Sequence, residues 1–297
     1  MSPDHPDVKG FQAIGQASVM YDVLNNVAEN SQLSHARAYE VNLAIEHLKH
    51  SSDNDLLLYD RNYPSYFHLA NRSKLNKKFV IRGEAASFNQ ARDMLQGKGP
   101  ESQIVTLKPI QCKLPEIKAN NLPKQITVRF VRVLLETGEL EVLVTNLLDE
   151  TQFPTEEFLD IYNMRWGTEG FYAILKTRLN LENFSGKTAQ SVYQDFYSTV
   201  YLTGLETILT ADVSAQLSKK PVKNKQQVNH AVSFNAIKNQ AIELLCSDEA
   251  PDVVIKRLEK LFLTNLVSIR KHRYVPRQKR SARHQINYLK RQRKIVF

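Results

Sequence analysis

Residues 162–176 read YNMRWGTEGFYAILK, and the spacing of polar side chains makes this stretch the most informative in the chain. Tyr162 is followed at offsets of 3, 7 and 14 residues by Arg165, Glu169 and Lys176. At about 100° per residue, these four side chains share one face of an α-helix. Such a face suits a phosphodiester, because the carboxylate can hold a metal ion while the cations hold phosphate oxygens. The alternative is a solvated helix face with ordinary ion pairs.

The opposite side of this helix is apolar, which predicts that it faces the protein core. Its members are Met164, Phe171, Ile174 and Leu175. Gly167 and Gly170 each cost about 1 kcal/mol in a helix interior, so they indicate a close backbone approach by a neighbouring element. Trp166 is interpreted as packing at the helix edge, the alternative being stacking on a flipped base.

A second informative stretch lies upstream, where residues 56–65 read LLLYDRNYPS. The apolar run 56–59 predicts a short strand buried on both faces, and Asp60 follows it at the start of a turn. Before it, residues 17–24 predict a strand, and Ser34 is an expected N-cap for a helix that continues to His50. A strand, a helix and a buried strand ending in a carboxylate indicate an α/β core.

Farther along, the local pattern changes twice. Residues 77–150 contain several short β-prone runs, which predict a mostly β insertion. Thr155 is then expected to cap the helix that carries Glu169, and more helices follow at about 188–217, 229–247 and 251–268. The predicted divisions are a first part of the core (1–76), the insertion (77–150), a second part of the core (151–268) and a basic C-terminal segment (269–297).

The net charge of +9 comes from one end of the chain. Residues 270–294 contain eleven Arg or Lys and no acid, and subtracting these eleven from 40 leaves 29 basic against 31 acidic residues elsewhere. Such a segment is typical of an arm that binds nucleic acid nonspecifically, although a solvated tail has the same composition. The expected DNA-binding residues are Arg270, Lys271, Arg273, Arg277, Lys279 and Arg280.

Other classes of protein find no support in the sequence. No apolar run approaches the roughly 20 residues that span a bilayer, and the N-terminus does not resemble a signal peptide. Cys112 and Cys246 lie far apart without a zinc or disulfide spacing, so we expect a reducing cytoplasm. The basic C-terminal segment adds the expectation of an association with the nucleoid. His47 and His50 are interpreted as a solvated helix end. Tyr193, Tyr197 and Tyr201, four residues apart, indicate a core or interface stripe, the alternative being a platform for bases.

The pattern Tyr-x2-Arg-x3-Glu-x6-Lys, carried by Tyr162, Arg165, Glu169 and Lys176, resembles the signature of the insertion-sequence-4 family of bacterial DDE transposases. The stretch LLLYDRNYPS is similar to the Asp-Arg-Gly-Tyr block of that family, with Asn62 in place of glycine. Asn tolerates the left-handed conformation, so the turn can form. The resemblance implies a ribonuclease-H-like core that is interrupted by a mostly β insertion and followed by C-terminal helices.

The resemblance also implies roles for single residues. Asp60 and Glu169 match the second and third catalytic acids, which bind metal, and Tyr162, Arg165 and Lys176 match positions that grip DNA phosphates. The intact family enzyme uses two Mg²⁺ (or Mn²⁺) ions to cleave and join DNA at transposon ends. The implied partner is double-stranded DNA, at both transposon ends and target; a homodimer is one candidate assembly, and no membrane is involved.

The sequence departs from the family at the first catalytic aspartate, which belongs on a strand before residues 17–24. Asp4 and Asp7 lie among prolines, and Asp22 lies inside the next strand, so we expect the first acid to be missing and this chain to be an inactive, N-terminally truncated copy. The alternative to an active transposase is therefore a truncated protein that only binds DNA or full-length transposase, as an inhibitor or a remnant. Another ribonuclease-H-like nuclease would explain the fold but not the signature.

Overall fold

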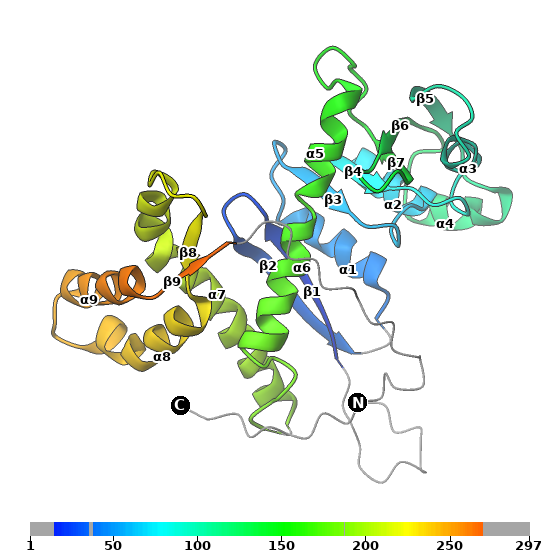
Figure 1. Ribbon diagram of the computed structural model, residues 1–297. Coiled ribbons are helices and arrows are strands. Elements are labelled where there is room, and N and C mark those ends of the chain that lie inside the picture. The colour runs from blue at the N-terminus through cyan, green and yellow to red at the C-terminus, as the bar shows by residue number, and fades with distance from the viewer. Residues whose placement is uncertain (1–14, 36–37, 187, 270–297) are drawn as a thin grey trace, which may run out of the picture. The chain divides into compact units, whose positions relative to one another are not determined.

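A computed structural model describes most of the chain, which divides into two compact units (Figure 1). The described residues are 15–35, 38–186 and 188–269. We call Met1–Val23 with Glu29–Glu169 the sheet unit, and Leu24–Ala28 with Gly170–Phe297 the helical unit. The six basic residues expected to bind DNA nonspecifically, from Arg270 to Arg280, lie outside the described residues.

The sheet unit is built on a mixed five-stranded sheet with the order β3-β4-β7-β6-β5. β3 pairs with β4 in parallel, and the other neighbours are antiparallel. Gly138, with a φ of 83°, lies in the turn that joins β6 to β7. The strand bounds are β3 Leu56–Tyr59, β4 Lys78–Arg82, β5 Ser102–Leu107, β6 Ile126–Leu134 and β7 Leu140–Thr145.

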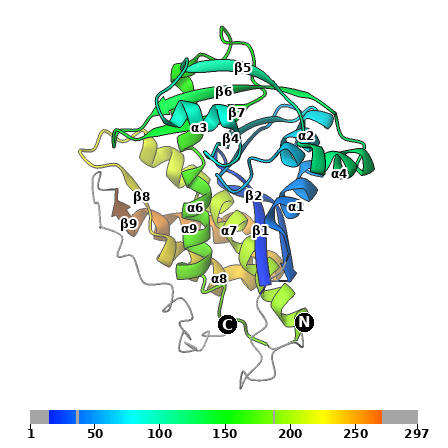
Figure 2. The ribbon, with the colours of Figure 1, turned by 90° about the vertical axis from the view of Figure 1, so that its right-hand side faces the viewer.

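Both faces of this sheet are covered, because its central strands carry apolar side chains at successive positions. Phe79 and Ile81 of β4 pack among residues of α2, α3 and α4, whereas Val80 between them packs with Phe158 of α5 on the other face. Figure 2 shows α3 lying along β6 and β7. The helices are α2 Tyr66–Lys74, α3 Asn89–Leu95, α4 Leu114–Ala119 and α5 Phe158–Asn163, with the short helix η2 at Gln111–Lys113.

The expected insertion at residues 77–150 shares its sheet with the strand before it. β3 from the first expected segment and β4 to β7 from the second form one hydrogen-bonded sheet. β3 is an edge strand among the described residues, and its four residues are only half-buried. The prediction of a strand there is confirmed, but the prediction that it is buried on both faces is wrong.

The start of the described chain differs from the expected strand and helix. β1 (Gly15–Asp22) confirms the strand, but it forms a two-stranded sheet with β2 (Val27–His35), which includes the expected helix cap Ser34. α1 starts only at Glu40 (Glu40–Glu46) and continues into η1 (His47–Lys49). The interpretation of His47 as solvated is also wrong: it is 5% exposed, and its ring nitrogens lie 3.0 Å from Ser18 Oγ and 2.6 Å from Asn30 Oδ1.

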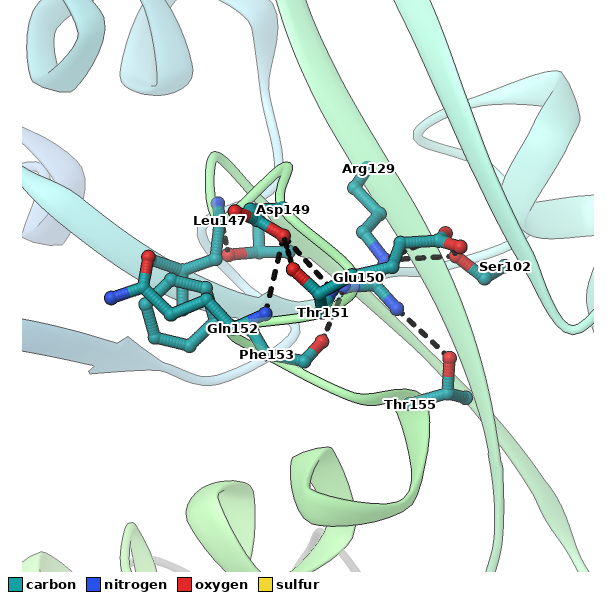
Figure 3. Close-up of polar contacts among 10 residues, drawn as sticks. Ser102, Arg129, Leu147, Asp149, Glu150, Thr151, Gln152, Phe153 and Thr155 are labelled. Atoms are coloured by element: carbon teal, nitrogen blue, oxygen red, sulfur yellow. Dashed lines mark hydrogen bonds and ion pairs between the residues drawn. The ribbon is translucent and has the colours of Figure 1, made fainter.

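One buried arginine connects the sheet to the loop that precedes α5 (Figure 3). Arg129 of β6 is fully buried, and its guanidinium donates to the Phe153 carbonyl (2.6 Å), Ser102 Oγ (2.8 Å) and Thr155 Oγ1 (2.8 Å). Glu150 Oε1 lies 3.4 Å from its Nε. Hydrogen bonds to a charged donor are among the stronger ones in proteins. Arg129 therefore fixes the point at which the chain leaves the sheet to enter α5.

The predicted helix with the Tyr-Arg-Glu-Lys pattern is interrupted. The short helix η3 (Thr155–Glu157) leads into α5, which ends at Asn163. The next helix, α6, covers Trp166–Ala173, and it is followed by η4 (Ile174–Arg178), which is a π-helix. Thr155 accepts the Arg129 hydrogen bond and does not cap the helix. Of the expected core-facing residues, Phe171 and Leu175 are buried, Ile174 is partly buried and Met164 is exposed.

The helical unit has a core of its own, formed between α7, α8, α9 and the short strands β8 and β9. All three helices were predicted, and Thr188 caps α7 as a Ser191 N–H acceptor. The bounds are α7 Ala189–Ser218, β8 Gln226–Val228, α8 His230–Cys246, α9 Pro251–Thr264 and β9 Leu266–Ser268. Among the described helices, none is both long and apolar enough to cross a bilayer.

Candidate functional site

Asp60 lies in the turn that follows β3. Its Oδ1 accepts a hydrogen bond from the Arg61 backbone N–H (2.7 Å), and its carbonyl accepts one from the Tyr63 N–H (3.2 Å). The carboxylate is thereby held near its own backbone. Positive φ occurs at four other asparagines but not at Asn62, so this turn does not use the left-handed conformation that the replaced glycine suggested.

Aromatic and cationic side chains behind Asp60 anchor the same turn. The Arg72 guanidinium lies 4.0 Å from the centroid of the Tyr59 ring, and the rings of Tyr59 and Tyr63 lie 5.1 and 5.3 Å from that of His68. The Tyr63 hydroxyl donates to Glu40 Oε1 of α1. His68 and Arg72 are fully buried, and burial holds the pKa of His68 well below its usual value, so this histidine is neutral. Sequence reasoning missed this cluster, although His68 and Arg72 are four residues apart and therefore lie on the same face of a helix.

Arg165 is the centre of the candidate site. Its Nη1 donates to Glu169 Oε1 at 3.0 Å, and it interacts electrostatically with Asp60. The guanidinium lies 5.4 Å from the Tyr162 ring centroid and 4.7 Å from that of Trp166. One cation thus interacts with both carboxylates that the sequence singled out, although one follows β3 and the other lies on α6.

Electrostatics at Arg165 and Tyr162 agree with this arrangement. Burial lowers the pKa of Arg165, but Tyr162, Asp60 and Glu169 outweigh burial and raise it overall. The pKa of Tyr162 is raised, chiefly by burial, and its hydroxyl has no hydrogen-bond partner among the described residues. Arg165 therefore stays charged at every physiological pH, and Tyr162 stays a neutral phenol.

The predicted close backbone approach in this segment is present at one of the two glycines. A Cβ at Gly167 would lie 3.2 Å from Val23 Cγ1, at the end of β1, whereas a Cβ at Gly170 would meet nothing within 4 Å. The interpretation of Trp166 as a residue at the helix edge agrees with its 55% exposure, with the Arg165 guanidinium stacked on its ring. Gly167 lets this part of α6 approach the end of β1.

Two residues of the site were not found from the sequence. Glu141 of β7 interacts electrostatically with Asp60 and Arg165, and its Oε1 forms an ion pair with Arg82 Nη2 of β4 at 2.6 Å. Burial raises the pKa of Glu141, and Arg82 opposes that shift. Glu141 and Arg82 also line a shallow cavity of about 380 Å³ together with Arg61 and Glu84. The signal available in the sequence was a charged residue inside each of two apolar strands.

Lys176 belongs to the helical unit, where it is exposed and its Nζ lies 3.4 Å from Glu182 Oε1. It is located in the π-helix η4, so the straight α-helix that would place it on the same face as Tyr162 is not present. The four signature residues also differ in exposure, since Tyr162 and Arg165 are buried and Glu169 and Lys176 are not.

The donor set of the site suits one divalent cation. Asp60 and Glu169 offer carboxylate oxygens, which are the preferred ligands of Mg²⁺, and both interact with the same guanidinium. Among the residues that the structure describes, no three His, Cys, Asp or Glu side chains lie close enough to hold a metal ion together. Asp60 and Glu169 are thus a pair of carboxylates of the ligand type that Mg²⁺ prefers.

A family model described as the transposase DDE domain matches residues 2–202. This match spans about two thirds of the chain and includes Asp60, Tyr162, Arg165, Glu169 and Lys176. The chain belongs to the DDE transposase domain family. Membership of this family implies that the protein binds DNA. DDE transposases also generally use divalent metal ions. No curated protein gives a significant match.

Proposed function

We propose that this DDE transposase is of the insertion-sequence-4 type, and that Asp60 and Glu169 are two of its catalytic acids. The proposal rests on Arg165, which forms an ion pair with Glu169 at 3.0 Å and interacts electrostatically with Asp60. Asp60 follows β3 and Glu169 lies on α6, and a cation that interacts with both lowers the electrostatic repulsion between two carboxylates before a metal ion binds. Its proposed substrate is double-stranded DNA at transposon ends and target, which assigns the protein to the nucleoid.

The basic and aromatic residues have distinct proposed roles. When DNA binds, Arg165 exchanges a carboxylate partner for a phosphate oxygen. Its planar guanidinium can donate two parallel hydrogen bonds to either a carboxylate or a phosphate. Lys176, which is exposed, contacts a second phosphate as a point charge. Because the Tyr162 hydroxyl is buried, we assign Tyr162 to positioning Arg165 and not to direct phosphate contact.

Asp60 and Glu169 would hold Mg²⁺ or Mn²⁺. When bound, such an ion lowers the pKa of water and stabilises the leaving oxygen of an in-line displacement. Glu169 is well placed to exchange its partner, because its side chain is 52% exposed while that of Arg165 is 10% exposed. Asp60 keeps one oxygen bonded to the Arg61 N–H, which fixes the carboxylate plane.

A second function, DNA binding without cleavage, is favoured by the number of carboxylates. The described residues contain no group of three ligands for a metal, whereas the two ions of the family mechanism require more than two carboxylates between them. We therefore expect the 297-residue chain to bind DNA and one divalent ion without cutting DNA.

DNA binding across a salt series tests the proposed site. We expect Arg165→Ala and Lys176→Ala each to weaken binding to transposon-end DNA several-fold, and to reduce the salt slope by about 0.9, which is the effect of one phosphate contact. Glu169→Ala should leave the affinity unchanged or raise it. Lys118→Ala is the matched control, because Lys118 is an exposed cation on α4. That helix covers the sheet face opposite to the one that α5 covers. Slopes for Arg165→Ala and Lys176→Ala equal to that of Lys118→Ala would contradict the proposal.

The same proteins decide between the two functions when Mn²⁺ is added to labelled end DNA. We expect no strand cleavage, but we expect Mn²⁺ binding that Asp60→Ala and Glu169→Ala abolish. Cleavage by the chain that Asp60→Ala removes would exclude the binding-only function and point to Asp4, Asp7 or Asp22 as the third acid. Mn²⁺ binding that is unaffected by both substitutions would contradict the metal assignment itself.

A further inference from the structure

The outer face of α7 carries exposed apolar side chains that neither the site nor the core of the helical unit uses. Tyr193, Tyr197 and Tyr201 are 42%, 45% and 61% exposed, and Ile208 is 69% exposed. The rings of Tyr193 and Tyr197 stack with centroids 6.3 Å apart. The tyrosine stripe is therefore not part of the core, which leaves an interface or a platform for bases as its function.

The exposed positions follow a heptad pattern. Six residues at alternating spacings of four and three form what we call the α7 seam, and five of them are exposed while Gly204 is half-buried. The opposite face of α7 is buried in the unit's own core through residues such as Thr203, Leu209 and Val213. Spacing of this kind is typical of a helix that packs against a second helix. The seam consists of Tyr197, Tyr201, Gly204, Ile208, Ala211 and Ala215.

The charge of α7 excludes nucleic acid as the occupant of the seam. None of its 30 residues is Lys or Arg, although the whole chain has 40, and its only charged residues are Asp195, Glu206 and Asp212. Aromatic platforms for bases need cations nearby to hold the phosphates, and helices that lie on membranes are rich in the same cations. The seam therefore fits a protein partner.

We propose that the α7 seam pairs antiparallel with the α7 seam of a second copy of this chain. In that register Tyr197 faces Ala215 of the second copy, Tyr201 faces Ala211, and Ile208 faces Gly204. Every large side chain thus meets a small one, and the two-fold symmetry repeats each layer. In a parallel pair, Tyr201 would face Tyr201 and Gly204 would face Gly204, which crowds one layer and leaves another empty.

Local details agree with the antiparallel register. A Cβ at Gly204 would meet nothing within 4 Å in the monomer, so the space in front of this residue is open to the Ile208 side chain of the second copy. Asp212, the acid beside the seam, would lie opposite Ser198 and not opposite another Asp212. On one flank, Thr207 Oγ1 donates to the Asn26 carbonyl (2.9 Å), which borders the seam without covering it.

The expected interface is small. The seam extends about 27 Å along the helix, at 1.5 Å per residue. A single helix pair of this length falls at the lower end of specific interfaces, about 1,200 Å² or less, so we expect a micromolar dimer. This proposal does not depend on the catalytic role of Asp60 or Glu169.

Sedimentation of the full chain with matched variants tests the pairing. We expect Ile208→Glu to raise the dimer dissociation constant at least tenfold. Ile242→Glu, which places the same charge at a 78% exposed isoleucine on α8, should have no effect. Gly204→Leu should raise helix propensity and leave the fold intact, yet weaken the dimer, because the new side chain occupies the space assigned to Ile208. A chain that is monomeric at about 100 µM, or equal effects of Ile208→Glu and Ile242→Glu, would overturn the proposal.

Disulfide trapping tests the register. In a background where Cys112 and Cys246 are replaced by serine, a Tyr201→Cys chain mixed with an Ala211→Cys chain should form a mixed disulfide on oxidation. Neither chain alone should cross-link. A disulfide dimer of Tyr201→Cys alone would indicate parallel pairing and overturn the antiparallel register, and an absence of any cross-link would overturn the seam. Circular dichroism of each variant confirms that the helices are intact.

Discussion

The sheet unit and the helical unit surround their histidines with different groups. The sheet unit buries Arg129 with three hydrogen bonds and keeps His47 neutral between Ser18 and Asn30. The helical unit instead buries the carboxylate Glu206, 4% exposed, which accepts from Ser233 Oγ at 2.6 Å and lies 3.0 Å from His230 Nδ1. Because one unit buries a neutral histidine and the other pairs a histidine with an acid, we expect pH to affect their stabilities in opposite directions.

The largest effect should come from Arg129→Met. Removing the guanidinium takes away the donor to the half-buried Phe153 carbonyl and to the Ser102 and Thr155 hydroxyls, which should destabilise the sheet unit by roughly 2–4 kcal/mol. Trp166, the single tryptophan, lies in the sheet unit, so its fluorescence during urea unfolding measures this loss. Arg92→Met at an exposed arginine is the control, and a similar small change in both variants would show that the network contributes little.

An intermediate effect is expected at His47. Burial, and secondarily the charge of His50, lowers the pKa of His47 to about 4 from the ordinary value of 6.5. The folded state therefore binds fewer protons than the unfolded state between these values. The contribution of His47 to stability is complete above about pH 6.5 and is lost as the pH falls toward 4, which should cost roughly 1–3 kcal/mol.

The measurement for His47 is the free energy of unfolding from tryptophan fluorescence at pH 7 and pH 4.5. His47→Gln should make the two values more similar than they are in the parent chain, because glutamine does not titrate. An unchanged difference between the two pH values would assign the acid sensitivity to other groups in the sheet unit.

The smallest effect should come from His230. Its hydrogen bond to Glu206 raises its pKa above the ordinary value, and burial opposes that shift. The stabilisation is therefore complete below about pH 6.5 and is lost as the pH rises through the folded pKa. Because the His230 side chain is 37% exposed, we expect less than about 1 kcal/mol. Urea unfolding followed by far-UV circular dichroism at pH 5.5 and 8.5 should show a slightly higher free energy of unfolding of the helical unit at pH 5.5. His230→Gln should abolish this difference. A helical unit that is more stable at pH 8.5 would contradict the expectation that pH affects the two units in opposite directions.

The sequence predicted elements whose local pattern is strong. Alternation or continuous apolar runs identified β3 and the strand-rich stretch 77–150, which contains β4 to β7, and 3.6-residue periodicity identified α7 to α9. β2 was missed because VAENSQLSH has neither pattern, and its pairing with β1 is a tertiary fact. The break between α5 and α6, and the π-helix that carries Lys176, depend on backbone hydrogen bonds that the residue spacing does not record.

The candidate site was predicted in part. Asp60, Arg165 and Glu169 could be selected because they belong to recognisable local patterns, and Arg165 forms an ion pair with Glu169 and interacts electrostatically with Asp60. Glu141 and Arg82 were missed because they meet only through the pairing of β4 with β7. The exposure of the tyrosine stripe on α7 also required the structure, since the spacing alone did not separate a core position from an interface position.

The position of β3 at the edge of the described sheet has a consequence for Asp60. A strand of four residues with one hydrogen-bonded neighbour opens locally at a lower free energy than the strands at the centre of the sheet. Asp60 is attached to that strand, and what limits its excursions is the aromatic and cationic cluster on its inner side, with Arg72 beneath Tyr59. Asp60, the proposed catalytic acid, therefore follows an edge strand of the described sheet, and its position depends on side-chain packing more than on backbone hydrogen bonds between strands.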